Sequence, residues 1–214
     1  MLRRVPALLA TSALALTALS ATAPANAQVA KGNESLAAVL TSDGNTFDKD
    51  AGDFDILTEA ALAVVGAKPD SPVALIADGS QRLTVFAPTD QAFRLLAKDL
   101  TGKTVKSEKK IFGALVELAG VDTIESILLY HVVPGATLNS KKVLQADGAR
   151  LETANGAKVK VKVKMPAHGS PSVILKDRDR NDRNARAILD ALDINKGNKQ
   201  IAHAIDRVLR PIDL

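Results

Sequence analysis

Lysine alternates with valine between residues 158 and 164, and this run is the strongest chemical signal in the sequence. Side chains of a β-strand alternate between two faces, so the lysines would share one face and the valines the other. Successive lysines would then be about 6.6 Å apart, at roughly 3.3 Å per residue, which suits contacts with a phosphate-bearing polymer. Alternatively, the lysines lie on a solvent face and protect an edge strand against aggregation. The four lysines are Lys158, Lys160, Lys162 and Lys164.

Charge is distributed unevenly along the chain. Residues 28–60 hold two lysines and seven acids, for a net charge of −5. Residues 141–164 hold seven bases and two acids, for a net charge of +5. Such a dipole could bind an anionic polymer of the cell envelope, or join protomers head to tail.

A second charged stretch begins like a calcium-binding loop. Asp177, Asp179 and Asn181 have the spacing of the first three ligands of such a loop. The sixth position is Asp182 where a calcium loop needs glycine, and the twelfth is Ile188 where it needs glutamate. Three arginines interleaved with the acids would also repel a cation. We therefore expect a solvated, self-neutralising loop here and no metal site.

The sequence contains no established catalytic motif. It has no G-x-S-x-G, no H-E-x-x-H and no phosphate-binding loop, and its three histidines are far apart. We therefore predict that the protein is not an enzyme and has no cofactor, no metal ligands and no catalytic residues. A hydrolase that uses two carboxylates brought together by folding is the remaining enzymatic alternative.

The composition excludes several other functions. The chain has 214 residues, with 46% hydrophobic and 24% charged residues, which is ordinary globular composition. It contains no cysteine, which excludes disulfides, thiol catalysis and thiolate-bound metals. Because it has no tryptophan and one tyrosine, a surface that stacks nucleic-acid bases is not expected.

The N-terminus has the three parts of a secretory signal peptide. Arg3 and Arg4 precede an apolar stretch over residues 7–23, and Ala-Asn-Ala at 25–27 is a cleavage motif. We predict cleavage after Ala27; an uncleaved membrane anchor is the alternative. Removal of two arginines lowers the net charge from +4 to +2, so the basic pI gives no reason to expect nucleic acid. No second apolar span follows, so we expect a secreted protein, extracellular or envelope-associated.

The remaining sequence predicts an α+β fold. Helical patterns occur mainly before residue 145 and strand patterns after it, a segregation that argues against a parallel βαβ sheet. Asp53 is a candidate N-cap for a helix ending near Gly66. A strand at 83–86 leads into another helix. The side chain of Thr89 or Asp90 could accept a hydrogen bond from the first backbone amides of that helix.

Two further local patterns predict a helix break at residue 120 and a hairpin at residues 155–156. A glycine at position 120 and a capping pattern just after it divide two helices. Asn-Gly at 155–156 predicts a hairpin. We expect a loosely packed N-terminal arm over residues 28–52 and one domain over residues 53–214.

Three stretches together resemble the fasciclin domain. Residues 83–93 (LTVFAPTDQAF) match the family's TVFAPTDxAF, residues 127–135 (ILLYHVVPG) match its YHVVPG, and residues 201–211 (IAHAIDRVLRP) match its closing pattern. The resemblance covers residues 53–213, and the chain looks like a secreted bacterial single-domain member. It implies two β-sheets forming a wedge with helices packed on one side. It also implies a non-catalytic adhesion module at the cell surface or extracellular matrix, binding a protein or polysaccharide.

The resemblance also implies candidate interaction residues. The family associates the Tyr130–His131 pair with receptor binding, and its adhesive peptide matches this chain at Asp193 and Ile194. His131 lies on the apolar face of its helix. In the closing strand, His203 lies on the same face as Ile201 and Ile205. We therefore predict that both histidines point inward and are structural.

Overall fold

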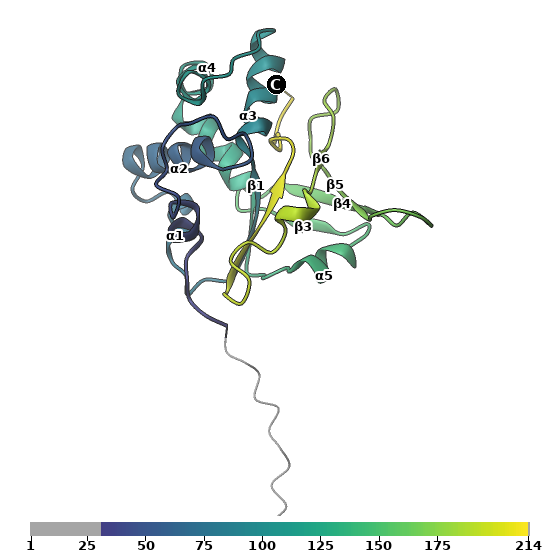
Figure 1. Cartoon of the computed structure of the whole chain (residues 1–214). Coiled ribbons are helices and arrows are strands. Elements are labelled where there is room, and N and C mark those ends of the chain that lie inside the picture. Colours follow the sequence, from purple (N-terminus) through teal and green to yellow (C-terminus); the bar gives the residue numbers. More distant parts are fainter. Residues whose placement is uncertain (1–30, 214) are drawn as a thin grey trace, which may run out of the picture. The chain divides into compact units, whose positions relative to one another are not determined.

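The computed structural model describes residues 31–213 (Figure 1). The predicted signal peptide, residues 1–27, lies outside this range. None of the helices within residues 31–213 is both long enough and apolar enough to cross a bilayer. The elements in chain order are α1 (Leu36–Leu40), α2 (Asp55–Ala67), η1 (Pro72–Ala77), β1 (Leu83–Pro88), α3 (Asp90–Thr101), α4 (Glu108–Tyr130), β2 (Val132–Pro134), α5 (Ser140–Leu144), β3 (Arg150–Glu152), β4 (Lys158–Lys164), β5 (Ser172–Lys176), β6 (Ala185–Arg186), η2 (Leu189–Ala191) and β7 (Gln200–Ile205).

The strands form two sheets. The first has the order β2-β1-β7, in which β1 pairs antiparallel with β2 and parallel with β7. The second has the order β3-β4-β5-β6 and is antiparallel throughout. The predicted hairpin is confirmed, because β3 and β4 pair across the Asn-Gly turn at 155–156. The predicted α+β class is confirmed as well.

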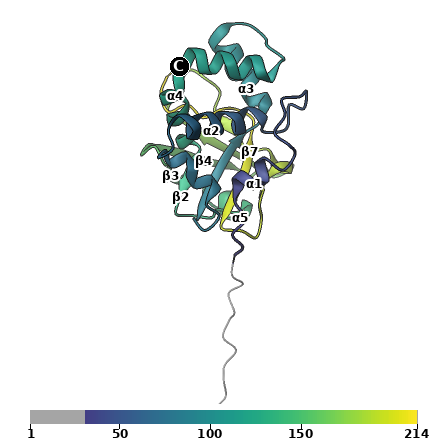
Figure 2. The same cartoon turned by 90° about the vertical axis from the view of Figure 1, so that its left-hand side faces the viewer.

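The first sheet lies between two hydrophobic cores. Every residue of β1 and β7 is buried, as expected for a parallel pair covered on both faces. Val85 of β1 packs with the helices, whereas the next residue, Phe86, packs with Val159 and Val161 of the second sheet. Figure 2 shows α2 and α4 on the side of β7 that faces the viewer. The helices therefore cover one face of the first sheet and the second sheet covers the other.

Helix α4 contains the predicted break. Gly120 has a φ of +71°, outside the helical region, and divides the segment into two helical parts. Glycine adopts this left-handed conformation without the steric cost of a side chain. The second part ends at Tyr130 and places Ile127 and Leu128 in the core.

The capping prediction for α2 is wrong. The residue before the helix is Phe54, and no side chain of the preceding segment accepts a hydrogen bond from its first amides. The acceptor is instead Asp90, whose Oδ1 accepts from the backbone N of Ile56 at 3.1 Å. The sequence predicts Thr89 or Asp90 as the cap of α3; Thr89 occupies the N-cap position, but its side chain accepts no hydrogen bond from the helix. Asp90 instead accepts from α2, whose residue Ile56 lies 34 positions earlier in the chain. This contact places Asp90 beside Asp53.

The expectation of a loosely packed N-terminal arm over residues 28–52 is also wrong for residues 31–40, whereas residues 41–52 are mostly exposed. Leu36 and Leu40 of α1 are buried in the helix-side core. The backbone N of Leu36 donates to Oε1 of Gln200 in β7 at 2.7 Å. Gly32 lies beside Asn198 in a parallel bridge just before the same strand. Residues 31–40 are therefore part of the packed fold.

Strand β4 is not at an edge. It pairs with β3 on one side and with β5 on the other. The alternative interpretation of its lysines, protection of an edge strand, is therefore wrong, because β4 has a strand neighbour on each side, over Lys158–Lys160 on one and Lys160–Lys164 on the other.

Candidate functional site

The lysines of β4 form an exposed row, as their alternation with valine predicts. Lys158, Lys160, Lys162 and Lys164 are exposed, whereas Val159 and Val161 are fully buried in the core between the sheets. The buried valines hold the strand against the first sheet, so the lysines are carried by a rigid element.

Neighbouring strands extend this row into a surface. Lys160 lies between Arg150 of β3 and Lys176 of β5, and residues in register on adjacent strands share a face. Arg186 of β6 is in register with Ile174, which is itself in register with Lys162. One acid, Glu152, lies opposite Lys158. We call this surface the basic face; its bases are Arg150, Lys158, Lys160, Lys162, Lys164, Lys176 and Arg186.

The bases of the basic face form no ion pair within residues 31–213, although Glu152 lies opposite Lys158. Within residues 31–213, ion pairs shorter than 4.0 Å involve only the bases Lys68, Arg94, Lys196 and Arg210. Like charges placed opposite one another across strands are destabilising. The row Arg150–Lys160–Lys176 is therefore an arrangement that folding alone does not favour.

A groove continues the basic face toward the helices. It is lined by Lys162, Lys164 and Lys176 of the face, and by Arg183 and Arg207 beside it. Asp182 and Asp206 are the acids that also line it. The bases outnumber the acids, so the groove extends the positive surface.

Tyr130 and His131 do not form part of an exposed contact surface. Tyr130 is 0% exposed, and its hydroxyl donates to the backbone O of Lys158 at 3.2 Å. His131 is 1% exposed; its Nε2 accepts from the backbone N of Leu209 at 2.9 Å, so the proton is on Nδ1, which donates to the O of Ile127 at 2.7 Å. Burial lowers the pKa of His131 to about 4, which keeps it neutral at physiological pH. The prediction that His131 points inward is confirmed.

His203, Asp193 and Ile194 are likewise engaged within the fold. His203 is buried in β7; its Nε2 lies 2.7 Å from the O of Leu138, and its Nδ1 accepts from the backbone N of Asp193 at 3.2 Å. The Asp193 carboxylate accepts from the backbone N and Oγ of Ser140 at 2.6 and 2.7 Å. Ile194 forms a bridge with Ala202. Asp193 and Ile194 therefore position the segment before β7, and the structure does not join them to the lysine row.

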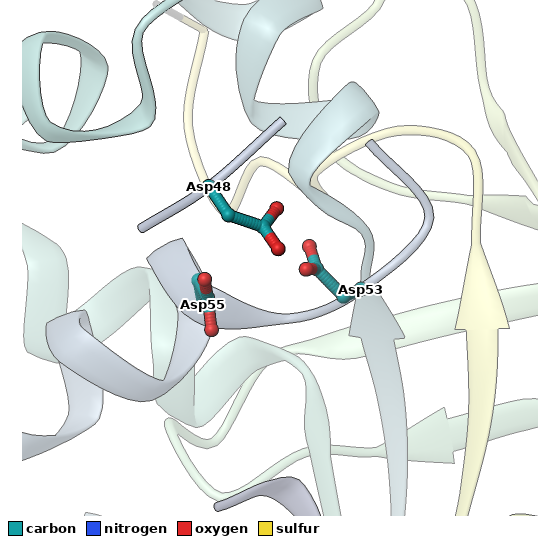
Figure 3. A group of neighbouring side chains, drawn as sticks. All are labelled: Asp48, Asp53 and Asp55. Atoms are coloured by element: carbon teal, nitrogen blue, oxygen red, sulfur yellow. The ribbon is translucent and has the colours of Figure 1, made fainter. Parts of the chain in front are cut away.

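The structure also gathers acids that the sequence patterns did not reveal. Asp48, Asp53 and Asp55 lie together at the start of α2, and Figure 3 shows the carboxyl groups of Asp48 and Asp53 turned toward each other. Asp90 and Glu108 approach Asp53 from the first residues of α3 and α4. We call these five residues the Asp53 cluster. The charge count of residues 28–60 indicates only that this segment is acidic. It does not reveal the cluster, because Asp90 and Glu108 lie later in the sequence and reach this segment only in the folded protein.

Comparison with known proteins defines the class of this fold. The fasciclin domain model matches residues 71–211, so the chain belongs to the fasciclin family, as the sequence motifs predict. Members of this family are adhesion or extracellular binding modules. Among solved structures, the chain is similar to a FAS1 domain pair of the insect cell adhesion molecule fasciclin I, with 19% identity and a TM-score of 0.46. That match covers 71% of this chain and 44% of the other. No curated protein matches the chain.

Proposed function

We propose that this protein is a secreted, non-catalytic fasciclin module that acts at the cell surface or in the matrix, where its basic face binds an anionic polymer. The observation that carries this proposal is the array of seven exposed bases on one sheet, without an ion pair to any acid in residues 31–213. The proposal of secretion rests on the signal-peptide pattern of residues 1–27.

The spacing of the basic face suits a polymer with regularly repeated negative charges. Lysines along β4 repeat at about 6.6 Å, and neighbouring strands lie about 4.8 Å apart. A flexible chain of carboxylate, sulfate or phosphate groups could therefore contact several lysines at once. Because the strands are fixed by the buried valines, only the lysine side chains have to be ordered on binding.

Two observations support a role without catalysis. The sequence carries no catalytic motif, and the two acids that later helices bring to the Asp53 cluster are enclosed: Asp90 is 0% exposed and Glu108 is 1% exposed. A glycosidase needs its two carboxyl groups on either side of a sugar, in an open cleft. Three of the five acids of the Asp53 cluster, Asp55, Asp90 and Glu108, are buried and do not face such a cleft.

The proposal can be tested by binding the full chain to immobilised dextran sulfate across a salt series. Contacts with a polyanion weaken steeply with salt, because bound counterions are released. The triple variant Lys160→Gln, Lys162→Gln, Lys176→Gln should bind at least tenfold more weakly at low salt. Its slope of log K against log salt should fall by about 2–3, at roughly 0.7–0.9 per lost contact.

A matched variant distinguishes an effect of this surface from an effect of the protein's overall charge. Lys98→Gln, Lys103→Gln, Lys106→Gln removes the same charge from exposed lysines around the end of α3 and should leave binding nearly unchanged. Equal weakening of both variants would contradict the basic face as the site. Binding to envelope material that persists at high salt would instead indicate an apolar protein contact. Secretion is tested by N-terminal analysis of the exported protein, which should begin at Gln28.

A further inference from the structure

The carboxylates of the Asp53 cluster have the spacing of ligands around one ion. One oxygen each from Asp53, Asp90 and Glu108 lies within 4.8 Å of the other two, and the same holds for Asp48, Asp53 and Asp55. Oxygens that bind one Ca²⁺ at about 2.3–2.6 Å are separated by at most about 5 Å. Asp53 belongs to both groups and is therefore the central residue of the cluster.

Two oxygens of the cluster are enclosed and have no hydrogen-bond partner within residues 31–213. They are Oδ2 of Asp90 and Oδ1 of Asp53. The other oxygen of Asp90 accepts from the N of Ile56 at 3.1 Å, and the Asp90 carboxylate has an oxygen within 4.8 Å of those of Asp53 and Glu108. A carboxylate oxygen held away from water without a partner is costly. Both oxygens therefore require either a proton or a cation.

The charges around the cluster do not balance internally. Arg94 is the only base that forms an ion pair with these five acids in the described chain, and it contacts Glu108 at 2.7 Å. The same residue Glu108 also accepts from the backbone N of Asp48 at 2.6 Å. The N-termini of α2, α3 and α4 lie beside Asp55, Asp90 and Glu108, and each contributes about half a positive charge. The sum still leaves an excess of about two to three negative charges.

Protons offset part of this excess when no cation is bound. Burial raises the pKa of Asp90 to about 8, and the charges of Asp53 and Glu108 add to the rise. Burial and the neighbouring acids Asp55 and Asp48 raise the pKa of Asp53 to about 6. A proton shared between Asp53 and Asp90 is therefore the competitor of a metal ion at this place.

We propose that Asp53, Asp90 and Glu108 form a calcium site, with Asp48 at its solvent-exposed side. The ion would satisfy both enclosed oxygens and offset the excess negative charge. It would also connect the first turns of α3 and α4 with the segment that leads into α2. Calcium suits the site better than magnesium, because magnesium requires near-ideal octahedral geometry at about 2.0–2.1 Å and keeps several waters. This proposal is independent of the basic face.

The site can be tested on the full chain, freed of metal with EDTA and then supplied with CaCl₂ alone. Calcium at about 100 times its dissociation constant should raise Tm by about 5–10 °C, against NaCl of equal ionic strength. Equilibrium dialysis with ⁴⁵Ca²⁺ should give one ion per chain. At pH 7 in weak buffer, calcium should also release protons, because Asp90 must ionise to bind.

A pair of isosteric variants makes the test specific. In Asp53→Asn, the new amide can donate to the free oxygen of Asp90, so Tm in EDTA should not fall, whereas the response to calcium should be lost. The control Asp70→Asn removes the same charge from an exposed loop and should respond like the unmodified protein. If calcium neither binds nor shifts Tm, a shared proton occupies the site and the proposal is wrong. An equal calcium response in Asp53→Asn would place the ion elsewhere.

Discussion

Two acidic clusters of this molecule differ in how their charge is neutralised. The first surrounds Arg210, which is 4% exposed and contacts Asp99, Asp179 and Asp182 at 2.8, 3.1 and 3.2 Å. The second is the Asp53 cluster, which holds five carboxylates and one paired base, Arg94, at its side. The planar guanidinium of Arg210 reaches three acids at once from the centre, which a base at the side cannot do.

The difference shows which acids are available to a ligand. Two acids around Arg210, Asp179 and Asp182, lie in the stretch that begins like a calcium loop, yet the fold gives them a cation of its own. The acids of the Asp53 cluster have no such sequence pattern, and two of their oxygens have no hydrogen-bond partner among residues 31–213. Missing counter-charge therefore marks a candidate site better than the density of acids does. The basic face is the corresponding case for positive charge, because its bases form no ion pair with an acid in residues 31–213.

Removing Arg210 should have the largest effect, because it makes the first cluster resemble the second. Arg210→Met leaves three carboxylates near one another without their central cation. Breaking a buried ion pair by removing one partner costs about 3–5 kcal/mol. Urea unfolding followed by circular dichroism should show a loss of stability of this size. Arg207→Met is the control, since Arg207 forms no ion pair within residues 31–213. A loss below about 1 kcal/mol for Arg210→Met would mean that Arg210 does not neutralise the first cluster, and the two clusters would then not differ in this respect.

The pH dependence of stability should show the uncompensated acids directly. The pKa of Asp90 in the folded protein, about 8, lies above that of an unfolded aspartate, about 3.9. The folded state therefore holds a proton that the unfolded state releases. The stabilisation is complete below about pH 4 and is lost as pH rises through about 8.

In EDTA, the free energy of unfolding should fall by about 1–2 kcal/mol between pH 6.5 and pH 8.5. Asp177, whose pKa burial raises to about 6, has largely ionised by the start of this window. In Asp53→Asn the fall should be smaller, because the neighbouring charge is gone. Urea unfolding at the two pH values measures the difference. Equal falls in both proteins would mean that Asp53 and Asp90 do not interact.

The smallest effect is expected on the basic face, where like charges are exposed to water. Lys160→Gln relieves repulsion from Arg150 and Lys176, and should stabilise the protein by about 0.2–0.5 kcal/mol. Lys158→Gln is the matched control, because Lys158 lies opposite Glu152 and loses a favourable pair instead. Thermal unfolding at low salt should rank the two variants in this order. The reverse order would mean that the basic face is not under electrostatic strain.

Local patterns in the sequence predicted much of the fold. The Asn-Gly turn, the break at Gly120 and the alternation of lysine with valine depend on residues close together in the chain, and the structure confirms all three. The inward direction of His131 also followed from its place on a helical face. Such features need no knowledge of distant contacts.

The features that sequence patterns missed depend on contacts between distant segments. Arginines within the loop at 177–183 were expected to neutralise its acids, but Arg210 does so from the end of the chain. The Asp53 cluster needs Asp90 and Glu108 from two other helices. The inner position of β4 depends on pairing with β5 beyond a loop. Patterns among neighbouring residues in the sequence do not predict contacts of this kind.

We infer that uncompensated charge marks the places where this protein binds ligands. One ¹H–¹⁵N NMR titration of the full chain, first with a short sulfated oligosaccharide and then with CaCl₂, tests it directly. The oligosaccharide should shift the amides of β3, β4 and β5, and calcium should shift those of residues 48–56, 90–94 and 107–111. Shifts that concentrate around the Arg210 cluster, or no shifts with either ligand, would contradict the claim.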